Sequence, residues 1–359
     1  MSHWLDQVQQ RDALANGLDR SPIALDTEFI RERTFYPRLA LVQLRAANGD
    51  ACLIDPLALP EAGDLRRVLQ DDTLKIMHSP SEDIQAFQRG WKLVVGPVFD
   101  TQLAAALTGL GPGKSYQALV EEVLEIHLEK GETRSDWLQR PLTDSQRRYA
   151  AEDVLHLHEL HARLDRQLRE LGRLDWLTQD CARLIESASN DTPDPNPHLG
   201  SRAAQHMDPP TQARLRRLLL WRESMARRHD RPRSWILDNE LVVELATQTL
   251  TRSSFNALLD RHPRAPRRHR DELWQAVSSP LTEEDLVMRL AAAPDPSLRA
   301  PLKAMQAVVA DHASALNIPD GLLCAKRHLE TLLQERRWPT AIDGWRRPIL
   351  ENDLMQRLP

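Results

Sequence analysis

Short apolar runs alternate with stretches of helical spacing along the first half of the chain. Four runs predict β-strands, at residues 23–29, 39–44, 51–54 and 74–77. The first three follow one another without room for a helix, so we expect them to form an antiparallel meander. Helical spacing covers residues 61–70, 82–89, 101–108, 115–125 and 144–171. The pattern predicts an α/β domain with a mixed sheet.

Only helical spacing follows the proline-rich polar run at residues 191–200. It predicts helices over residues 211–228, 238–249, 253–259, 270–277, 283–292, 298–315, 320–335 and 348–357. A second break, at residues 293–296, contains two prolines that end the preceding helical pattern. We therefore expect two all-α bundles after the α/β domain. The predicted domains are 1–192, 208–292 and 295–359, with residues 193–207 as a linker.

The composition narrows the class of protein. Of the 359 residues, 41% are hydrophobic and 28% are charged, a balance typical of soluble globular proteins. No stretch approaches the ~18 to 20 apolar residues of a membrane span, and residues 1–6 lack the features of a signal peptide. Cys52, Cys181 and Cys324 are isolated, which favours neither a disulfide framework nor a thiolate zinc site. We expect a cytoplasmic protein without a membrane partner.

The net charge of −5 hides an asymmetry between the two halves. Residues 1–195 hold 22 Lys and Arg against 32 Asp and Glu, whereas residues 196–359 hold 25 against 20. Within residues 214–270 there are 14 Arg and only six acids. Such an excess favours binding of a phosphate backbone without sequence readout, although a solvated helix face would look similar.

Asp26 and Glu28 form the sharpest local feature. They stand at positions i and i+2 of a predicted strand, so they point to the same face. Two adjacent carboxylates repel each other unless a cation lies between them, so the pair suggests a divalent metal. The alternative is a solvated strand end.

Two further segments offer partners for this pair. Asp83 lies where the fourth strand gives way to a helix, although an acid there is often only favourable to the helix dipole. Tyr149 and Asp153 are i and i+4 and share one helix face. The apolar stripe of that helix should pack on the sheet and could bring Asp153 over the first strand. Tyr149 could instead be an aromatic residue at the core edge.

These residues, in this order, resemble the motifs of the DEDD superfamily of 3'-to-5' exonucleases, in its Tyr-containing branch. The first motif corresponds to Asp26 and Glu28, the second to Asp83, and the third to Tyr149 and Asp153. Blocks that resemble the ribonuclease D family in particular lie at residues 33–39, 99–102 and 134–138. Segments that resemble the HRDC domain lie at residues 219–223, 231–238 and 241–246. Residues 297–359 resemble a second, more divergent HRDC-like domain.

The resemblance implies a ribonuclease H-like α/β nuclease domain followed by two all-α HRDC-type bundles. It implies a metal-dependent 3'-to-5' exoribonuclease that trims the 3' ends of tRNA precursors and other small structured RNAs and releases 5'-mononucleotides. Two Mg²⁺ or Mn²⁺ ions would be held by Asp26, Glu28, Asp83 and Asp153, and Asp26 would bridge them. Tyr149 would orient the attacking water. The family also implies a monomer.

RNA contacts are expected from aromatic and basic side chains. Phe35, Tyr36 and Trp137 could stack on terminal bases, or could equally be core residues. The candidate basic contacts are Arg216, Arg217, Arg227, Arg228, Arg231 and Arg233. Residues 109–115 look like a phosphate loop, but the spacing of their glycines is wrong, so we expect no nucleotide cofactor.

The sequence leaves two other functions open. A 3'-to-5' DNA exonuclease would use the same four carboxylates. A nucleic-acid-binding protein could use the helical modules for recruitment and the α/β domain as a scaffold, but a scaffold has no reason to keep mutually repelling carboxylates together.

Overall fold

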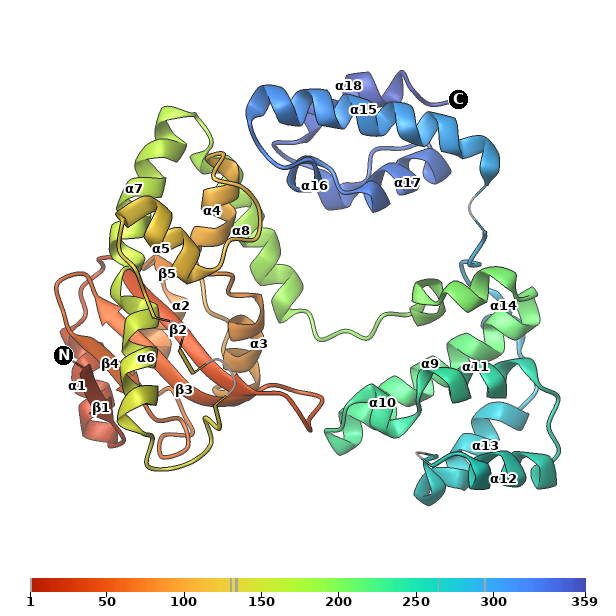
Figure 1. The fold of residues 1–359 in the computed structure, drawn as a ribbon. Helices are drawn as coiled ribbons and strands as arrows, with labels where there is room; N and C mark the ends of the chain where they lie inside the picture. The colour runs from red at the N-terminus through yellow and green to blue at the C-terminus, as the bar shows by residue number, and fades with distance from the viewer. Residues whose placement is uncertain (1, 130, 133–134, 264, 294) are drawn as a thin grey trace. The chain divides into compact units, whose positions relative to one another are not determined.

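The computed structural model describes residues 2–129, 131–132, 135–263, 265–293 and 295–359 (Figure 1). Arg134, Arg264 and Pro294, which the sequence analysis included, lie outside these residues. The chain forms two compact units. The first unit comprises Met1–Ile30, Pro37–Asn190 and Ser297–Pro359, and the second comprises Arg31–Tyr36 and Asp191–Pro296. Among the helices of the described residues, none is both long and apolar enough to cross a membrane.

A six-stranded mixed sheet forms the centre of the first unit, in the order β1-β4-β3-β2-β5-β6. The strands are β1 (Ser2–Leu5), β2 (Ile23–Ile30), β3 (Arg38–Ala46), β4 (Ala51–Ile54), β5 (Lys75–Met77) and β6 (Val98–Asp100). β2, β3 and β4 are antiparallel neighbours, which confirms the predicted meander. β1 pairs with β4, and β5 with β2 and β6, in parallel. The sequence pattern missed β1 and β6 because such short strands carry little periodicity.

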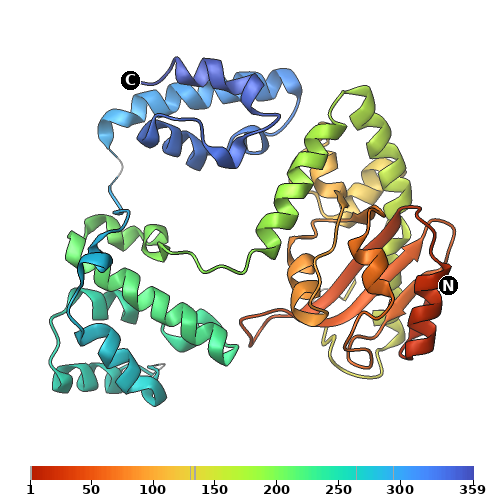
Figure 2. The same ribbon diagram turned by 180° about the vertical axis from the view of Figure 1, so that it is seen from behind.

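Helices cover both faces of this sheet. They are α1 (Val8–Gly17), α2 (Leu65–Gln70), α3 (Ser81–Gly90), α4 (Thr101–Leu107), α5 (Tyr116–Leu124), α6 (Asp144–Leu155), α7 (Leu157–Glu170) and α8 (Leu174–Ser189). α6 contacts β2 and β3 on one face, and α3 contacts them on the other, as the reversed view in Figure 2 shows. The sequence pattern missed α1 and α8.

The helix predicted over residues 144–171 is two helices in the structure. The series of backbone hydrogen bonds along the helix is interrupted at His156, because the Tyr116 hydroxyl inserts there. It donates to the Glu152 carbonyl (3.0 Å) and accepts from the His156 amide (3.1 Å). α6 contacts β2 and β3, whereas α7 contacts β5, α4 and α5.

The C-terminal part of the first unit packs against α8. It contains α15 (Arg299–Leu316), α16 (Asp320–Leu323), α17 (Lys326–Glu335) and α18 (Arg347–Met355), so the helix predicted over residues 320–335 is also divided. The rings of Trp176 and Trp345 stack with centroids 4.2 Å apart. The Arg346 guanidinium bonds both oxygens of Asp180, at 2.7 and 2.8 Å. This contact is largely buried.

The second unit is helical. Its α-helices are α9 (Pro209–His229), α10 (Arg233–Ile236), α11 (Asn239–Thr247), α12 (Arg252–Arg261), α13 (Arg270–Ser278) and α14 (Glu283–Leu286). α14 is shorter than the helix predicted over residues 283–292. A shared core contains Leu215, Leu241 and Phe255, and Phe35 from the segment between β2 and β3 belongs to the same core. Together the two units confirm the predicted fold class, an α/β domain followed by helical regions.

Candidate active site

The first two candidate residues lie on β2, at the centre of the sheet. Asp26 pairs in register with Gln43 of β3, and Glu28 with Leu41. Residues that face each other across antiparallel strands have their side chains on the same face. This face packs against α6, because Leu41 and Ala150 of α6 share one core cluster. Both acids therefore point toward α6.

Asp83 lies in the first turn of α3. The Thr27 hydroxyl donates to its Oδ1 at 2.5 Å, so the strand that carries the acid pair also fixes this third acid. The turn before α3 is held by Asp100, whose Oδ1 accepts from the backbone amide of Ser79 at 2.9 Å. Ser79 has a positive φ of 54°, a conformation that needs such support.

Tyr149 and Asp153 lie on α6, one turn apart, and the charge of Asp153 acts on the Tyr149 hydroxyl. The Tyr149 ring lies against the backbone of Gly131, where a Cβ atom would come within 1.8 Å of Tyr149 Cδ2. The indole of Trp137 is also a neighbour, with ring centroids 6.1 Å apart. The ring of Tyr149 thus packs beside a glycine and an indole.

Burial and mutual repulsion dominate the electrostatics of these acids. Burial, and then the charges of Asp83, Asp153 and Glu28, raise the pKa of Asp26 well above its usual range. Burial, Asp153 and Asp83 raise the pKa of Glu28 to about 9. Burial raises the pKa of Asp83 to about 6, although the hydrogen bond from Thr27 opposes this shift.

The same causes act on the α6 pair. Burial and the neighbouring charge of Glu152 raise the pKa of Asp153 to about 8, while the Tyr149 hydroxyl acts in the opposite direction. Burial and the nearby carboxylates also raise the pKa of Tyr149. Its hydroxyl therefore keeps its proton at neutral pH.

The donor set fits a hard divalent cation. The charges that raise the pKa of Asp26 and Glu28 all come from neighbouring carboxylates. A bound divalent cation would offset this mutual repulsion. Gln43, the partner of Asp26, has a 0% exposed side chain, and both its amide atoms are buried without a hydrogen-bond partner. Such an orphaned group commonly marks the place of an ion or water. Among the described residues, no three His, Cys, Asp or Glu side chains are already arranged to hold an ion.

The structure places the predicted aromatic contacts in cores, the alternative that the sequence left open. Trp137 is 2% exposed and belongs to the cluster beneath α6. Phe35 is 6% exposed, and Arg227 and Arg233 lie over its ring in the second unit. Tyr36 is half-buried in the same core. Neither Trp137 nor Phe35 offers an open ring face to a base in this conformation.

Several predicted basic contacts are engaged in ion pairs inside the second unit. Arg217 pairs with Asp285 at 2.6 Å. Arg227 and Arg233 both pair with Glu223, and the distance for Arg227 is 2.7 Å. The number of arginines in this unit therefore overstates the positive charge available to a phosphate backbone.

The remaining three predicted arginines differ in their surroundings. Arg216 donates to the carbonyl of Pro195 at 2.7 Å. Arg228 is exposed and lies 3.5 Å from Glu272. Arg231 is exposed. Arg228 and Arg231 are thus the most accessible members of the predicted set.

Sequence reasoning missed three residues that position the site. Thr27 holds Asp83, Asp100 holds the turn before α3, and Gly131 lies against Tyr149. Signals for two of them were present: Thr27 lies between the two acids of the first motif, and Asp100 stands at the N-cap position of α4. Gly131 had no signal, because its role depends on a ring distant in sequence.

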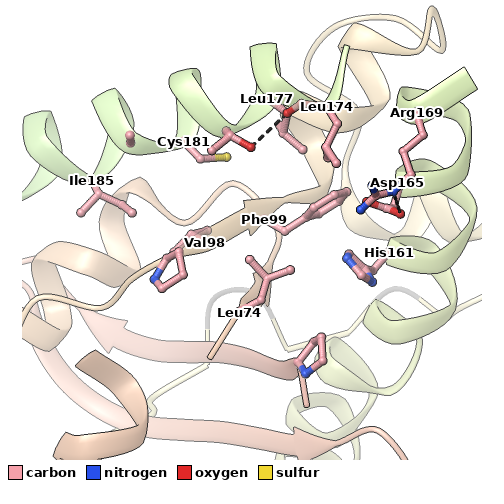
Figure 3. Close-up of a pocket in the computed structure, with 14 residues that line it drawn as sticks. Leu74, Val98, Phe99, His161, Asp165, Arg169, Leu174, Leu177, Cys181 and Ile185 are labelled. Carbon is pink, nitrogen blue, oxygen red and sulfur yellow. Dashed lines mark hydrogen bonds and ion pairs between the residues drawn. The ribbon is translucent and has the colours of Figure 1, made fainter. Parts of the chain in front are cut away.

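A cavity of about 440 Å³ lies elsewhere in the first unit, between β6, α7 and α8 (Figure 3). Its lining is mostly apolar and includes Phe99, Leu177 and Cys181. The charged groups at one end satisfy each other, since Arg169 Nε bonds Asp165 at 2.7 Å. None of the candidate catalytic residues lines this cavity, so it is not the active site.

Comparison with known families and proteins agrees with this geometry. The 3'-5' exonuclease family matches residues 3–169, and the HRDC domain family matches residues 211–276. The chain is 45% identical to ribonuclease D of Xanthomonas oryzae pv. oryzae, over 100% of this chain and 99% of the relative. It is 36% identical to ribonuclease D of Pseudomonas paraeruginosa, over 94% of this chain and 92% of the relative.

Among solved structures, the crystal structure of Escherichia coli RNase D aligns with a TM-score of 0.89 and 27% identity. The alignment covers 99% of this chain and 98% of that chain. The Escherichia coli protein is described as an exoribonuclease involved in structured RNA processing.

Proposed function

The chain belongs to the ribonuclease D family and is an exoribonuclease, and we propose that it trims the 3' ends of tRNA precursors and other small structured RNAs. The products are 5'-mononucleotides. The observation that carries the proposal is the group of four acids, on three elements, whose pKa values are raised by burial and by one another's charge.

We propose Asp26, Glu28, Asp83 and Asp153 as the ligands of two divalent ions, Mg²⁺ or Mn²⁺. Bound ions would supply the positive charge that stabilises the attacking and leaving oxygens of phosphodiester hydrolysis. The four carboxylates, all oxygen donors, suit these hard ions better than zinc. The orphaned amide of Gln43 supports the same location.

The role of Tyr149 follows from its protonation. Because burial and neighbouring carboxylates raise its pKa, the hydroxyl stays protonated at neutral pH and does not act as the base. It instead orients the attacking water by hydrogen bonding, with its ring fixed by Gly131 and Trp137. The charge of Asp153, one turn along the same helix, favours the protonated hydroxyl.

We also propose the domain limits expected from the sequence: a nuclease domain over 1–192, a linker over 193–207, an HRDC domain over 208–292 and a second HRDC-like domain over 295–359. The HRDC family match at residues 211–276 supports the third of these. The helical part between residues 297 and 359 supports the fourth only by its helix content.

The test is hydrolysis of a 3'-extended tRNA precursor with Mg²⁺, Mn²⁺ or EDTA. We expect shortening from the 3' end with either metal and none in EDTA. Asp26→Asn and Asp153→Asn should each lower the rate by at least ~10²-fold, because each loses a charged ligand. Asp144→Asn is the matched control, since Asp144 is an exposed acid in the first turn of the same helix as Asp153 and should keep its activity.

Two results would contradict the proposal. One is activity that persists in EDTA. The other is a near-normal metal-dependent rate in both Asn variants. A matched single-stranded DNA, assayed in parallel, measures the preference for ribose, which a contact to the 2'-hydroxyl would create.

A further inference from the structure

The second unit contains a polar cavity of about 410 Å³ that the active site does not use. One wall is the segment between β2 and β3, and the other is formed by α9, α10 and the start of α11. The lining residues are Arg31, Glu32, Thr34, Phe35, Arg222, Pro232, Arg233, Ser234 and Asn239. All of them belong to this unit.

The first wall is firmly held. Oδ1 of Asp230 accepts the backbone amides of Phe35 and Tyr36, each at 3.0 Å. The Phe35 ring is buried in the helical core, and Arg31 Nε donates to the Phe35 carbonyl at 3.1 Å. The cavity is therefore a built feature of the unit and not a gap beside a loose loop.

Arg222 is the residue that points to a ligand. Its Nη1 donates to Asn239 Oδ1 (2.8 Å) and to the Leu237 carbonyl (3.2 Å), while its Nε is buried without a partner. Within the described part of the chain, no carboxylate lies at ion-pair distance from Arg222, although Arg227 and Arg233 share Glu223 nearby. Glu223 and Asp238 lie near enough to offset part of the Arg222 charge, whereas burial and the neighbouring Arg233 oppose that charge. An anion in the cavity would stabilise this half-buried guanidinium further.

The charges and polar groups of the lining favour a phosphate as that anion. Three guanidinium groups, from Arg31, Arg222 and Arg233, line the cavity together with the carboxyl group of Glu32. Arg233 is already paired with Glu223, so Arg222 is the main candidate to bind an anion. Guanidinium groups match the geometry of phosphate oxygens with paired N–H donors. Ser234 is exposed at this cavity and adds a hydroxyl.

We propose that this cavity binds a backbone phosphate of the RNA substrate, upstream of the 3'-terminal nucleotide, with Arg222 as its principal contact. The inference rests on the proposed function for the identity of the ligand. It predicts that the contact contributes to the affinity for long RNA and not to the chemistry at the 3' end.

Ser234 allows a test without a change in the core. In the full-length protein, Ser234→Asp places a carboxylate in the cavity, and Ser234→Asn is the neutral control of nearly equal size. Binding of a labelled 12-nucleotide RNA is measured by fluorescence anisotropy in EDTA, over a series of salt concentrations. We expect Ser234→Asp to weaken binding about tenfold and to reduce the slope of log K against log[salt] by about 1. Ser234→Asn should match the unchanged protein.

A second pair of variants examines Arg222 itself. Arg222→Gln should weaken binding and lower the salt slope in the same way. Arg270→Gln is the control, because it removes the same charge from the same unit, but the Arg270 charge is already paired with Asp260 at 2.5 Å. Circular dichroism melting verifies that each variant is folded; if Arg222→Gln is not, the Ser234 pair decides alone.

Hydrolysis of a dinucleotide with Mg²⁺ separates this inference from the proposed function. We expect the Ser234 and Arg222 variants to keep the dinucleotide rate and to raise KM for the 12-mer about tenfold. Equal affinity and equal salt slope for Ser234→Asp and Ser234→Asn would overturn the phosphate site. Loss of all metal-dependent hydrolysis in the unchanged protein would instead overturn the proposed function, while the binding measurements in EDTA would still decide the phosphate site.

Discussion

At the scale of single residues, the site holds several carboxyl groups close together in a buried region, where water screens their repulsion only weakly. Glu28 shows the cost most clearly, because burial and the charges of Asp153 and Asp83 raise its pKa from 4.5 to about 9. Between these two values the folded protein holds a proton on Glu28 that the unfolded chain releases. Glu28 therefore makes the metal-free protein less stable as pH rises through this range.

We predict that Glu28→Gln stabilises the metal-free protein at pH 8 and not at pH 4. At pH 4 the carboxyl is largely protonated in both states, whereas at pH 8 only the unfolded state ionises freely. Thermal unfolding in EDTA should show a Tm several degrees higher for the variant at pH 8. Asp144→Asn, on the exposed turn of α6, should show no such pH-dependent gain.

Addition of Mg²⁺ should reverse the order at pH 8, because a bound cation stabilises the carboxylate and not the amide. A variant that is less stable than the unchanged protein at pH 8 in EDTA would show that the burial of Glu28 is not the dominant electrostatic cost.

The residue types of the site were predictable from spacing, but their surroundings were not. Alternation on a strand placed Asp26 and Glu28 on one face, and helical spacing placed Tyr149 with Asp153. The bond from Thr27 to Asp83 and the orphaned amide of Gln43 depend on strand register and on the packing of α3 and α6. Those are long-range properties that local pattern does not contain.

At the scale of elements, two contacts determine where α6 ends and how its Tyr149 ring is placed. The Tyr116 hydroxyl ends α6 at Leu155, and Gly131 receives the Tyr149 ring. The sequence predicted one long helix because the apolar stripe continues through His156. A side chain from α5 overrides that local preference, which periodicity alone cannot indicate.

We predict that Gly131→Ala lowers kcat by at least ~10²-fold while the protein stays folded. The new Cβ would lie 1.8 Å from Tyr149 Cδ2, so the ring must move, and small displacements of a positioning group cost rates of this size. Single-turnover hydrolysis measures the rate, and Tyr149→Phe, which keeps the ring and removes the hydroxyl, gives the reference loss.

Gly113→Ala is the control for this change. Gly113 also lies in a loop of the first unit, and a Cβ added there would meet nothing within 4 Å, although its own φ of 62° adds some backbone strain. A Gly131→Ala variant as active as Gly113→Ala would mean that the position of the Tyr149 ring does not matter for the rate.

At the scale of the whole molecule, buried ion pairs join parts that are distant in sequence. Asp180 of α8 is 8% exposed and accepts from Arg346, from Arg183 at 2.9 Å and from Trp345 Nε1 at 3.3 Å. A truncation that removes residues 205–359 would therefore also expose the Trp176 face of α8. Point variants are the better way to separate RNA binding from folding.

We predict that Asp180→Asn loosens the C-terminal helices from α8. The change leaves Arg346 buried without its counter-charge, at a cost of about 3 to 5 kcal/mol. Limited proteolysis should release fragments from residues 297–359 faster than in the unchanged protein. Glu186→Gln, an exposed acid on the same helix, should leave the proteolysis rate unchanged. Equal proteolysis rates for the two variants would mean that the stacked rings of Trp176 and Trp345, and not Asp180, hold the C-terminal helices against α8.

Local spacing along the chain was enough to predict the class of fold, the antiparallel meander and the pairs of site residues that share one face. The resemblance of the motifs to a known family indicated the family and the roles of the acids. Packing decided which arginines are already paired with an acid and which can attract an anionic ligand. Arg217, Arg227 and Arg233 pair with acids of their own unit, whereas Arg222 pairs with none in the part of the chain that the structure describes. Packing also placed Phe35 and Trp137 in cores. Counterions and burial come from contacts between residues far apart in the chain, and a sequence count treats every charge and every ring as free.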